Sequence, residues 1–125
     1  AIAARCYNLN KDELFTSLVE RERLGTTGFG SSVAIPHAKI LGLEHCVGVV
    51  LRLKSPVEYD AHDGRPVDLV FALFSPENQG VVHLKALADI SRLLRDENMV
   101  SKLRGADSED AIYALVTGQR EQQAA

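Results

Sequence analysis

The sequence predicts an α/β (α+β) fold, in which a β-sheet is covered by helices. Strand-like apolar segments occupy the middle of the chain, and segments with helical periodicity lie before and after them. Residues 67–74 (VDLVFALF) are almost uninterruptedly apolar, which is typical of a strand buried on both faces. With 125 residues, the chain has the length of one domain and can bury its own core.

The first predicted helix spans residues 10–24. Asn10 can cap its amino end, Glu13 completes a capping-box-like pair, and Gly25 follows the last turn as a stop signal. The apolar positions recur at helical spacing: Leu14, Phe15, Leu18 and Val19. We therefore expect this segment to be one of the helices that cover the sheet.

The strands are predicted from the segments that follow. A Gly/Ser/Thr-rich loop at residues 25–32 leads into a short extended segment at 33–36. Residues 46–53 form one strand, and 67–74 form a second, which the following Ser-Pro pair ends. Two prolines and a glycine make residues 54–66 largely loop, with room for a short edge pairing.

Three helices are predicted after the strands, at residues 81–95, 97–104 and 108–117. Ser108 caps the last of them, and Gly118 is expected to stop it. Residues 119–125 are then a polar, frayed tail, so that a single domain spans residues 1–118.

The opening residues 1–6 (AIAARC) are typical of the end of a helix, and neither an initiator Met nor a signal sequence stands before them. We therefore expect that the first elements of the domain are absent from this chain.

Composition narrows the class of function. Fourteen Lys and Arg against 17 Asp and Glu give a net charge of −3, which argues against binding to nucleic acid or to an anionic membrane surface. No apolar run approaches the roughly 20 residues of a membrane span. Cys6 and Cys46 form no CxxC pair, so we expect reduced thiols and a cytoplasmic protein.

His37 is the most informative of the four histidines. Pro36 stiffens the backbone that enters it, and the loop upstream offers small residues and hydroxyl groups. A histidine on rigid backbone beside a loop rich in hydrogen-bond donors suits a nucleophile whose product is an anion. His45 and His62 lie in polar stretches and are expected to be solvated loop residues.

His83 and Arg21 are further candidates. One stripe of the helix at 81–95 contains Leu84, Leu87, Ala88, Ser91 and Leu94. A second face carries His83 with Leu87, Ile90 and Leu94. His83 is therefore either a satisfied core residue or part of a site at the amino end of this helix, where negative charge is favoured. Arg21 either faces solvent or reaches over the Gly-rich loop to a phosphoryl group.

Two sequence blocks resemble enzyme IIA domains of the fructose/mannitol type, which belong to the phosphoenolpyruvate-dependent phosphotransferase system. The first block joins residues 21–30 (RERLGTTGFG) to 34–39 (AIPHAK), and the second joins 66–73 (PVDLVFAL) to 83–87 (HLKAL). Within that family the nitrogen-regulatory subgroup is the closer likeness, because of residues 59–71 and the helix segment 91–96.

The resemblance implies a mixed β-sheet with helices on both faces, and it implies that the first strand and most of the first helix are absent from this chain. It also implies a role for particular residues. His37 would be the phosphorylated histidine, His83 would orient or hydrogen-bond the phosphoryl group, and Arg21 would balance its charge. The phosphoryl group would also be bound by three loop residues: Thr26, Thr27 and Gly28. Docking of the partner would use a shallow surface around Phe29, Gly30 and Ile35.

The implied reaction is phosphoryl transfer from a phosphohistidine to a ring nitrogen of His37, for which the family pattern suggests Nε2. The donor would be an HPr-like phosphocarrier protein, and the other ring nitrogen would be held by a local acceptor. Because the donor is already activated, no metal, nucleotide or other cofactor is required. The regulatory subgroup would also bind protein targets such as regulators of potassium transport or of stress responses.

Two alternatives stay open from the sequence. The chain could be the IIA component of a fructose/mannitol-type sugar transport system. It could also be a metal- or ligand-binding module that uses His37 and His83, although no pair of ligands has the spacing of a zinc site.

Overall fold

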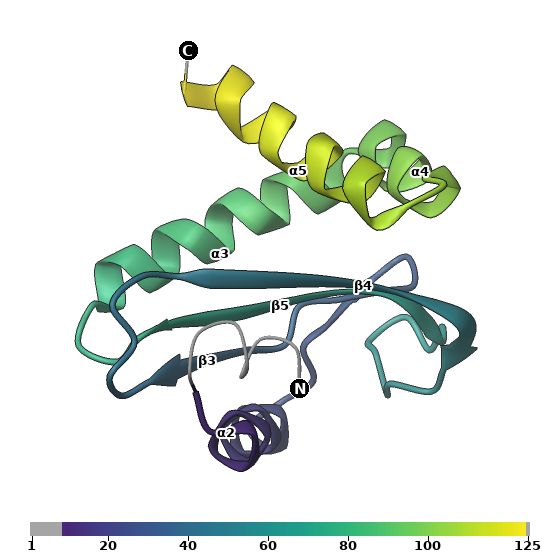
Figure 1. Cartoon of the computed structure of the whole chain (residues 1–125). Coiled ribbons are helices and arrows are strands. Elements are labelled where there is room, and N and C mark those ends of the chain that lie inside the picture. Colours follow the sequence, from purple (N-terminus) through teal and green to yellow (C-terminus); the bar gives the residue numbers. More distant parts are fainter. Residues whose placement is uncertain (1–8, 125) are drawn as a thin grey trace. The chain divides into compact units, whose positions relative to one another are not determined.

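Strand β5 (Val67–Pro76) is the centre of the sheet in the computed structural model, which describes residues 9–124 and the side chains of residues 9–118 (Figure 1). Along one edge, β2 (Val33–Ala34) and β3 (His37–Ile40) pair with it in parallel, and β1 (Gly28–Gly30) adds to β2 in antiparallel fashion. Along the other edge, β4 (Val47–Val57) is antiparallel. The predicted mixed sheet is confirmed.

The β2 and β3 strands are two halves of one interrupted strand. Val33 pairs with Leu69 and His37 pairs with Leu73, so the register is the same before and after the break. Pro36 lies in the break, because it has no N–H to donate to a ladder. Its carbonyl still accepts a hydrogen bond from the Leu73 N–H over 2.9 Å, which keeps the two halves aligned.

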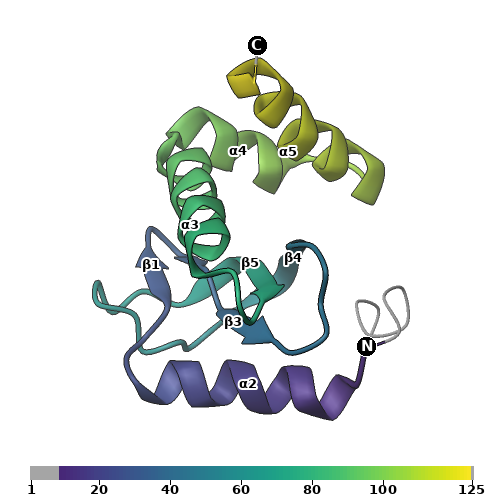
Figure 2. The same cartoon turned by 90° about the vertical axis from the view of Figure 1, so that its left-hand side faces the viewer.

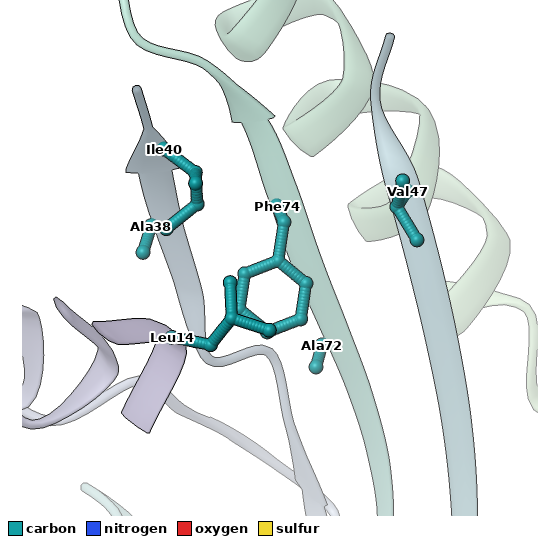
Figure 3. Close-up of a cluster of buried hydrophobic side chains, with 6 residues drawn as sticks. All are labelled: Leu14, Ala38, Ile40, Val47, Ala72 and Phe74. Atoms are coloured by element: carbon teal, nitrogen blue, oxygen red, sulfur yellow. The ribbon is translucent and has the colours of Figure 1, made fainter. Parts of the chain in front are cut away.

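Helix α2 (Lys11–Arg23) covers one face of the sheet (Figure 2). It begins as predicted, because the Asn10 side chain accepts hydrogen bonds from the Asp12 N–H over 2.9 Å and the Glu13 N–H over 3.1 Å. Figure 3 shows the core that it shares with three strands: Leu14, Ala38, Ile40, Val47, Ala72 and Phe74. Phe15, also predicted to belong to the apolar stripe, is instead 67% exposed.

The opposite face of the sheet carries the first turns of α3 (Gly80–Arg95). Since Ala38 and Ile40 face α2, the alternation of a strand turns His37 and Lys39 to the other face. Ser75 pairs with Lys39 and faces the same way, and it contacts His83 of α3. Helices therefore flank both faces, as the sequence predicts (Figure 2).

Several predicted boundaries in this part of the chain are wrong. Gly28–Gly30 is a short strand instead of loop, and the strand His37–Ile40 was not predicted. The strand predicted at 46–53 is β4, which runs on to Val57 through the segment predicted as loop; its edge position and a register irregularity between Arg52 and Val57 accommodate the proline there. Strand β5 likewise continues through Pro76.

The chain divides into two compact units, residues 1–86 and 87–125, with the boundary inside α3. In the second unit, α4 (Glu97–Gly105) and α5 (Glu109–Ala124) contact each other, and Met99, Val100 and Leu103 of α4 are buried. Ser108 caps α5 as predicted, since its Oγ accepts from the Ala111 N–H over 3.1 Å.

Gly118 does not end α5, which continues to Ala124, so the tail predicted as frayed is helical. A glycine costs an exposed helix only about 1 kcal/mol, and good helix formers follow it here. In α3, the predicted buried stripe through Leu84 and Ala88 is wrong, because both residues are exposed. The second predicted face is the buried one, since it contains His83 and Ile90.

Within residues 9–124, no helix is long and apolar enough to cross a membrane. The prediction that residues 1–6 are the end of a helix lies outside the described residues.

Candidate functional site

His37 opens strand β3, directly after the break that Pro36 makes. Its Nδ1 lies 2.8 Å from the carbonyl oxygen of Ile35. A carbonyl can only accept a hydrogen bond, so Nδ1 carries the proton and donates it. In the neutral ring, Nε2 is then the nitrogen with the free electron pair, which makes Nε2 the nucleophilic atom.

Arg21 lies in the last turn of α2 and reaches that nucleophilic atom. Its Nε donates a hydrogen bond to Nε2 of His37 over 3.1 Å, and its Nη1 donates to the carbonyl of Gly25 over 2.9 Å. The Gly25 bond anchors the guanidinium beside the ring. A positive, planar hydrogen-bond donor therefore stands at the place where a group bound to Nε2 would sit.

His83, in the first turns of α3, stands beside His37. The two ring centroids are 5.5 Å apart and the rings are tilted by 45°. The His83 side chain is buried, and its Nδ1 lies 2.7 Å from the hydroxyl oxygen of Ser75. The structure thus brings together His37, Arg21 and His83, which come from three separate elements.

Both histidines are held toward the neutral form. Burial lowers the pKa of His37 and the nearby charge of Arg21 lowers it further, while the hydrogen bond to Ile35 and the charge of Glu22 oppose this. Burial also lowers the pKa of His83, and the positive charge that His37 carries when protonated and that of Lys39 add to the effect. Near pH 7, the electron pair on Nε2 of His37 is therefore available.

Lys39 also lies at the candidate site, and it was not among the predicted candidates. It lies on the same face of β3 as His37, and its charge lowers the pKa of His83. A Cβ added to Gly80, at the start of α3, would lie 3.9 Å from its Nζ. The spacing His-x-Lys on a strand was the available signal, because residues two apart share a face.

The three loop residues expected to bind a phosphoryl group use their donors within the chain. The Thr27 N–H donates to both carboxylate oxygens of Glu22, over 3.0 and 3.2 Å, and its hydroxyl donates to the same carboxylate. The Gly28 N–H donates to the Thr26 hydroxyl oxygen over 3.1 Å, and that hydroxyl donates to the Tyr59 carbonyl over 3.4 Å. These bonds hold the loop in shape.

The residues of the expected docking surface differ in exposure. Phe29 and Gly30 are partly exposed, but the Ile35 side chain is only 5% exposed and belongs to the core. The Ile35 side chain therefore offers little surface to a partner. What Ile35 contributes to the site is its carbonyl group, which orients the His37 ring.

A second loop, residues 59–63, packs against the Gly/Ser/Thr-rich loop at residues 25–32. The sequence did not predict this contact. Ala61 packs so closely on Gly28 that a Cβ there would lie 2.6 Å from the Ala61 Cβ. The Tyr59 hydroxyl lies 3.1 Å from the Thr27 hydroxyl, and the Ser31 N–H donates to the Asp63 carboxylate over 2.9 Å. These contacts span more than thirty residues, which no local pattern reports.

The remaining candidates lie apart from this arrangement. His45 and His62 are exposed, as expected for solvated residues. In the described part of the chain, no group of three or more His, Cys, Asp or Glu side chains could hold a metal ion.

Comparisons with known proteins identify the family and the fold. Residues 2–118 match the family model "Phosphoenolpyruvate-dependent sugar phosphotransferase system, EIIA 2". A nitrogen regulatory protein of Bradyrhizobium diazoefficiens is 47% identical over 116 residues, which are 93% of this chain and 76% of that protein.

Solved structures show the same fold. The nitrogen regulatory protein IIA-Ntr from Neisseria meningitidis superposes with a TM-score of 0.83 at 35% identity, covering 90% of this chain and 77% of that one. The mannitol IIA protein of Escherichia coli has a TM-score of 0.65 at 19% identity, covering 86% and 75%, and shares the fold. The chain therefore belongs to the EIIA type 2 family of the phosphoenolpyruvate-dependent phosphotransferase system, and its relatives include nitrogen regulatory proteins.

Proposed function

We propose that this chain is a regulatory IIA protein that accepts a phosphoryl group on Nε2 of His37 and passes it on. The observation that carries the proposal is the pair of contacts on one imidazole. Nδ1 donates to the Ile35 carbonyl over 2.8 Å, and Arg21 donates to Nε2 over 3.1 Å. The first contact selects the nucleophilic tautomer, and the second supplies the positive charge that a bound phosphoryl group needs.

In the proposed step, the electron pair on Nε2 of His37 attacks the phosphorus of a phosphohistidine on the donor protein. The new N–P bond forms as the donor's N–P bond breaks, and the electron pair of the broken bond returns to the donor's ring nitrogen. The proton on Nδ1 stays in place, hydrogen-bonded to Ile35. Arg21 moves its hydrogen bond from Nε2 to the phosphoryl oxygens, since the nitrogen no longer has a free electron pair.

Catalysis in this scheme is mainly positioning and charge neutralisation, because phosphoryl transfer passes through a loose transition state. Arg21 neutralises one phosphoryl oxygen. Lys39 adds a second positive charge on the same face of β3, and His83 stands beside the ring at 5.5 Å. All of these groups belong to the chain itself, so the reaction as proposed uses no cofactor.

The proposed donor is an HPr-like phosphocarrier protein, which presents its own phosphohistidine to His37. The likeness to nitrogen regulatory proteins favours a regulatory output, in which the phosphorylated and free forms bind different protein targets. Regulators of potassium transport or of stress responses are the target classes that we propose. The site of action is the cytoplasm, where such carriers and targets are found.

The test is to incubate the chain with phosphoenolpyruvate, the general enzyme I and a phosphocarrier, and then to measure its intact mass. We expect the addition of a single acid-labile phosphate, its loss in His37→Ala, and its retention in the matched control His45→Ala, which changes an exposed histidine. Unchanged labelling of His37→Ala would overturn the proposal.

A further inference from the structure

Ser75 lies beside His83, on the face of the sheet that also carries His37. It belongs to β5, pairs with Lys39 of β3, and therefore faces the same side of the sheet as His37. It is fully buried, and its Oγ is 2.7 Å from Nδ1 of His83. It is also the one hydroxyl side chain in a strand of mostly apolar residues. A buried hydroxyl is unfavourable unless it is hydrogen-bonded, and the contact with His83 meets that need.

Cys46, just before β4, shows how the hydrogen atoms are arranged. Its Sγ donates a hydrogen bond to Oγ of Ser75 over 3.5 Å. The Ser75 oxygen thus accepts from Cys46, which leaves Nδ1 of His83 as the contact that can accept its own hydrogen. An Nδ1 that accepts a hydrogen bond carries no proton, so the proton of the neutral His83 ring is on Nε2.

We propose that Ser75 is a positioning residue that holds His83 in the tautomer with its proton on Nε2, so that His83 offers an N–H donor to the phosphoryl group on His37. The functional part of this inference rests on the proposed phosphorylation of His37. In the opposite tautomer, Nδ1 would donate to Ser75 and Nε2 would present an electron pair. That electron pair would repel the anionic oxygens of the phosphoryl group instead of binding them.

The arrangement of the two histidines is then reciprocal. His37 donates through Nδ1 to a backbone carbonyl and keeps Nε2 free as the nucleophile. His83 accepts at Nδ1 from a hydroxyl group and keeps Nε2–H free as the donor. One fold thus sets two neighbouring neutral imidazoles in opposite tautomers, one for attack and one for stabilising the product.

The tautomer is measured directly by long-range proton–nitrogen NMR on the full chain with 15N-labelled histidine, without any phosphorylation. At pH 7.5 we expect His83 with its proton on Nε2 in the wild type and a shift toward the Nδ1-protonated form in Ser75→Ala. Ser75→Thr keeps the hydroxyl group and is expected to restore the wild-type pattern. Cys46→Ala is the matched control, in which the Ser75 hydroxyl keeps Nδ1 as its acceptor and the tautomer is retained.

The second readout is the rate at which the phosphocarrier labels His37. Ser75→Ala is expected to slow this rate about threefold to tenfold, which is the factor that an ordinary hydrogen bond represents. One phosphate should still be bound at the end of the reaction, and Ser75→Thr should recover the wild-type rate. A wild-type His83 protonated on Nδ1, or a tautomer that Ser75→Ala leaves unchanged, would overturn the inference. If Ser75→Ala does not fold, the wild-type and Ser75→Thr spectra still decide the tautomer.

The two proposals fail separately. An unlabelled His37 with the expected His83 tautomer contradicts the proposed function and leaves the role of Ser75 in setting the tautomer intact. A labelled His37 with the wrong His83 tautomer overturns the inference about Ser75 alone.

Discussion

Nε of Arg21 donates a hydrogen bond to Nε2 of His37 over 3.1 Å, although the two residues are sixteen positions apart in the sequence. The contact joins the end of α2 to the start of β3, so the helix that covers one face of the sheet supplies the cation for a histidine that faces the other. It also occupies the atom that the proposed reaction uses, and it leads to the first prediction.

Arg21→Lys is expected to slow phosphorylation of His37 by about tenfold to a hundredfold. A lysine keeps the charge but loses the planar fork that bonds both the ring nitrogen and the Gly25 carbonyl, and a hydrogen bond to a charged group is worth roughly 1.5–3 kcal/mol. Stopped-flow or quenched-flow labelling measures the rate. Arg23→Lys, an exposed residue of the same helix turn, is the matched control and should label at the wild-type rate.

Stability and activity should both depend on pH below neutrality. The pKa values of His37 and His83 are lowered in the folded chain, chiefly by burial, so the unfolded chain binds more protons as the pH falls below about 6.5. The free energy of unfolding is therefore expected to be constant above that value and to decrease as the pH falls toward the folded-state pKa values. The rate of His37 labelling should decrease only as the pH reaches the lowered pKa of the folded His37 ring, because the protonated ring has no electron pair for attack.

Urea unfolding at a series of pH values checks this sign. In the double variant His37→Gln/His83→Gln, the slope below pH 6.5 should become smaller. A free energy of unfolding that rises as the pH falls through this window would contradict the assigned directions.

Gly28→Ala is expected to destabilise the chain by about 1–3 kcal/mol, because the new Cβ would lie 2.6 Å from the Ala61 Cβ and 2.9 Å from its Cα. The loss should be partly recovered in Gly28→Ala/Ala61→Gly, so that the two changes are not additive. Denaturant unfolding gives both values. The control is Gly105→Ala, since a Cβ there meets no atom within 4 Å and no loss of stability is expected.

Glu22→Gln tests the contacts that shape the Gly-rich loop. The carboxylate accepts from both the N–H and the hydroxyl of Thr27, and its charge raises the pKa values of His37 and Tyr59. We expect a loss of about 1–3 kcal/mol in stability and a lower pKa for both residues. Ultraviolet titration of tyrosine and NMR titration of histidine measure the two shifts, and Glu20→Gln, exposed on the same helix, should cause neither.

Local patterns were enough to predict the framework of this fold. The caps at Asn10 and Ser108, the buried strand at the centre of the sheet and the helix that carries His83 were all predicted from the sequence, and the structure confirms them. Each of these signals depends on neighbouring residues, as does the stiff Pro36–His37 step. The short strand His37–Ile40 was missed because four residues carry too little alternation to be distinguished from a loop.

The interior of the site could not be predicted in the same way. The bonds of Thr27 to Tyr59 and of Cys46 to Ser75 join residues about thirty positions apart, and they form only once the sheet brings those segments together. The loop hydroxyls illustrate the difference. The sequence identified Thr26 and Thr27 as donors, but only the fold shows that Glu22 and Tyr59 use them.

The atom that receives the phosphoryl group is the central claim of this account. Phosphorus–nitrogen coupling in the 15N-histidine-labelled protein, phosphorylated by the phosphocarrier, identifies that atom directly. The account predicts a single phosphorus resonance coupled to Nε2 of His37, with the Nδ1 proton retained. A phosphoryl group on His83, on Nδ1 of His37 or on no histidine at all would contradict it.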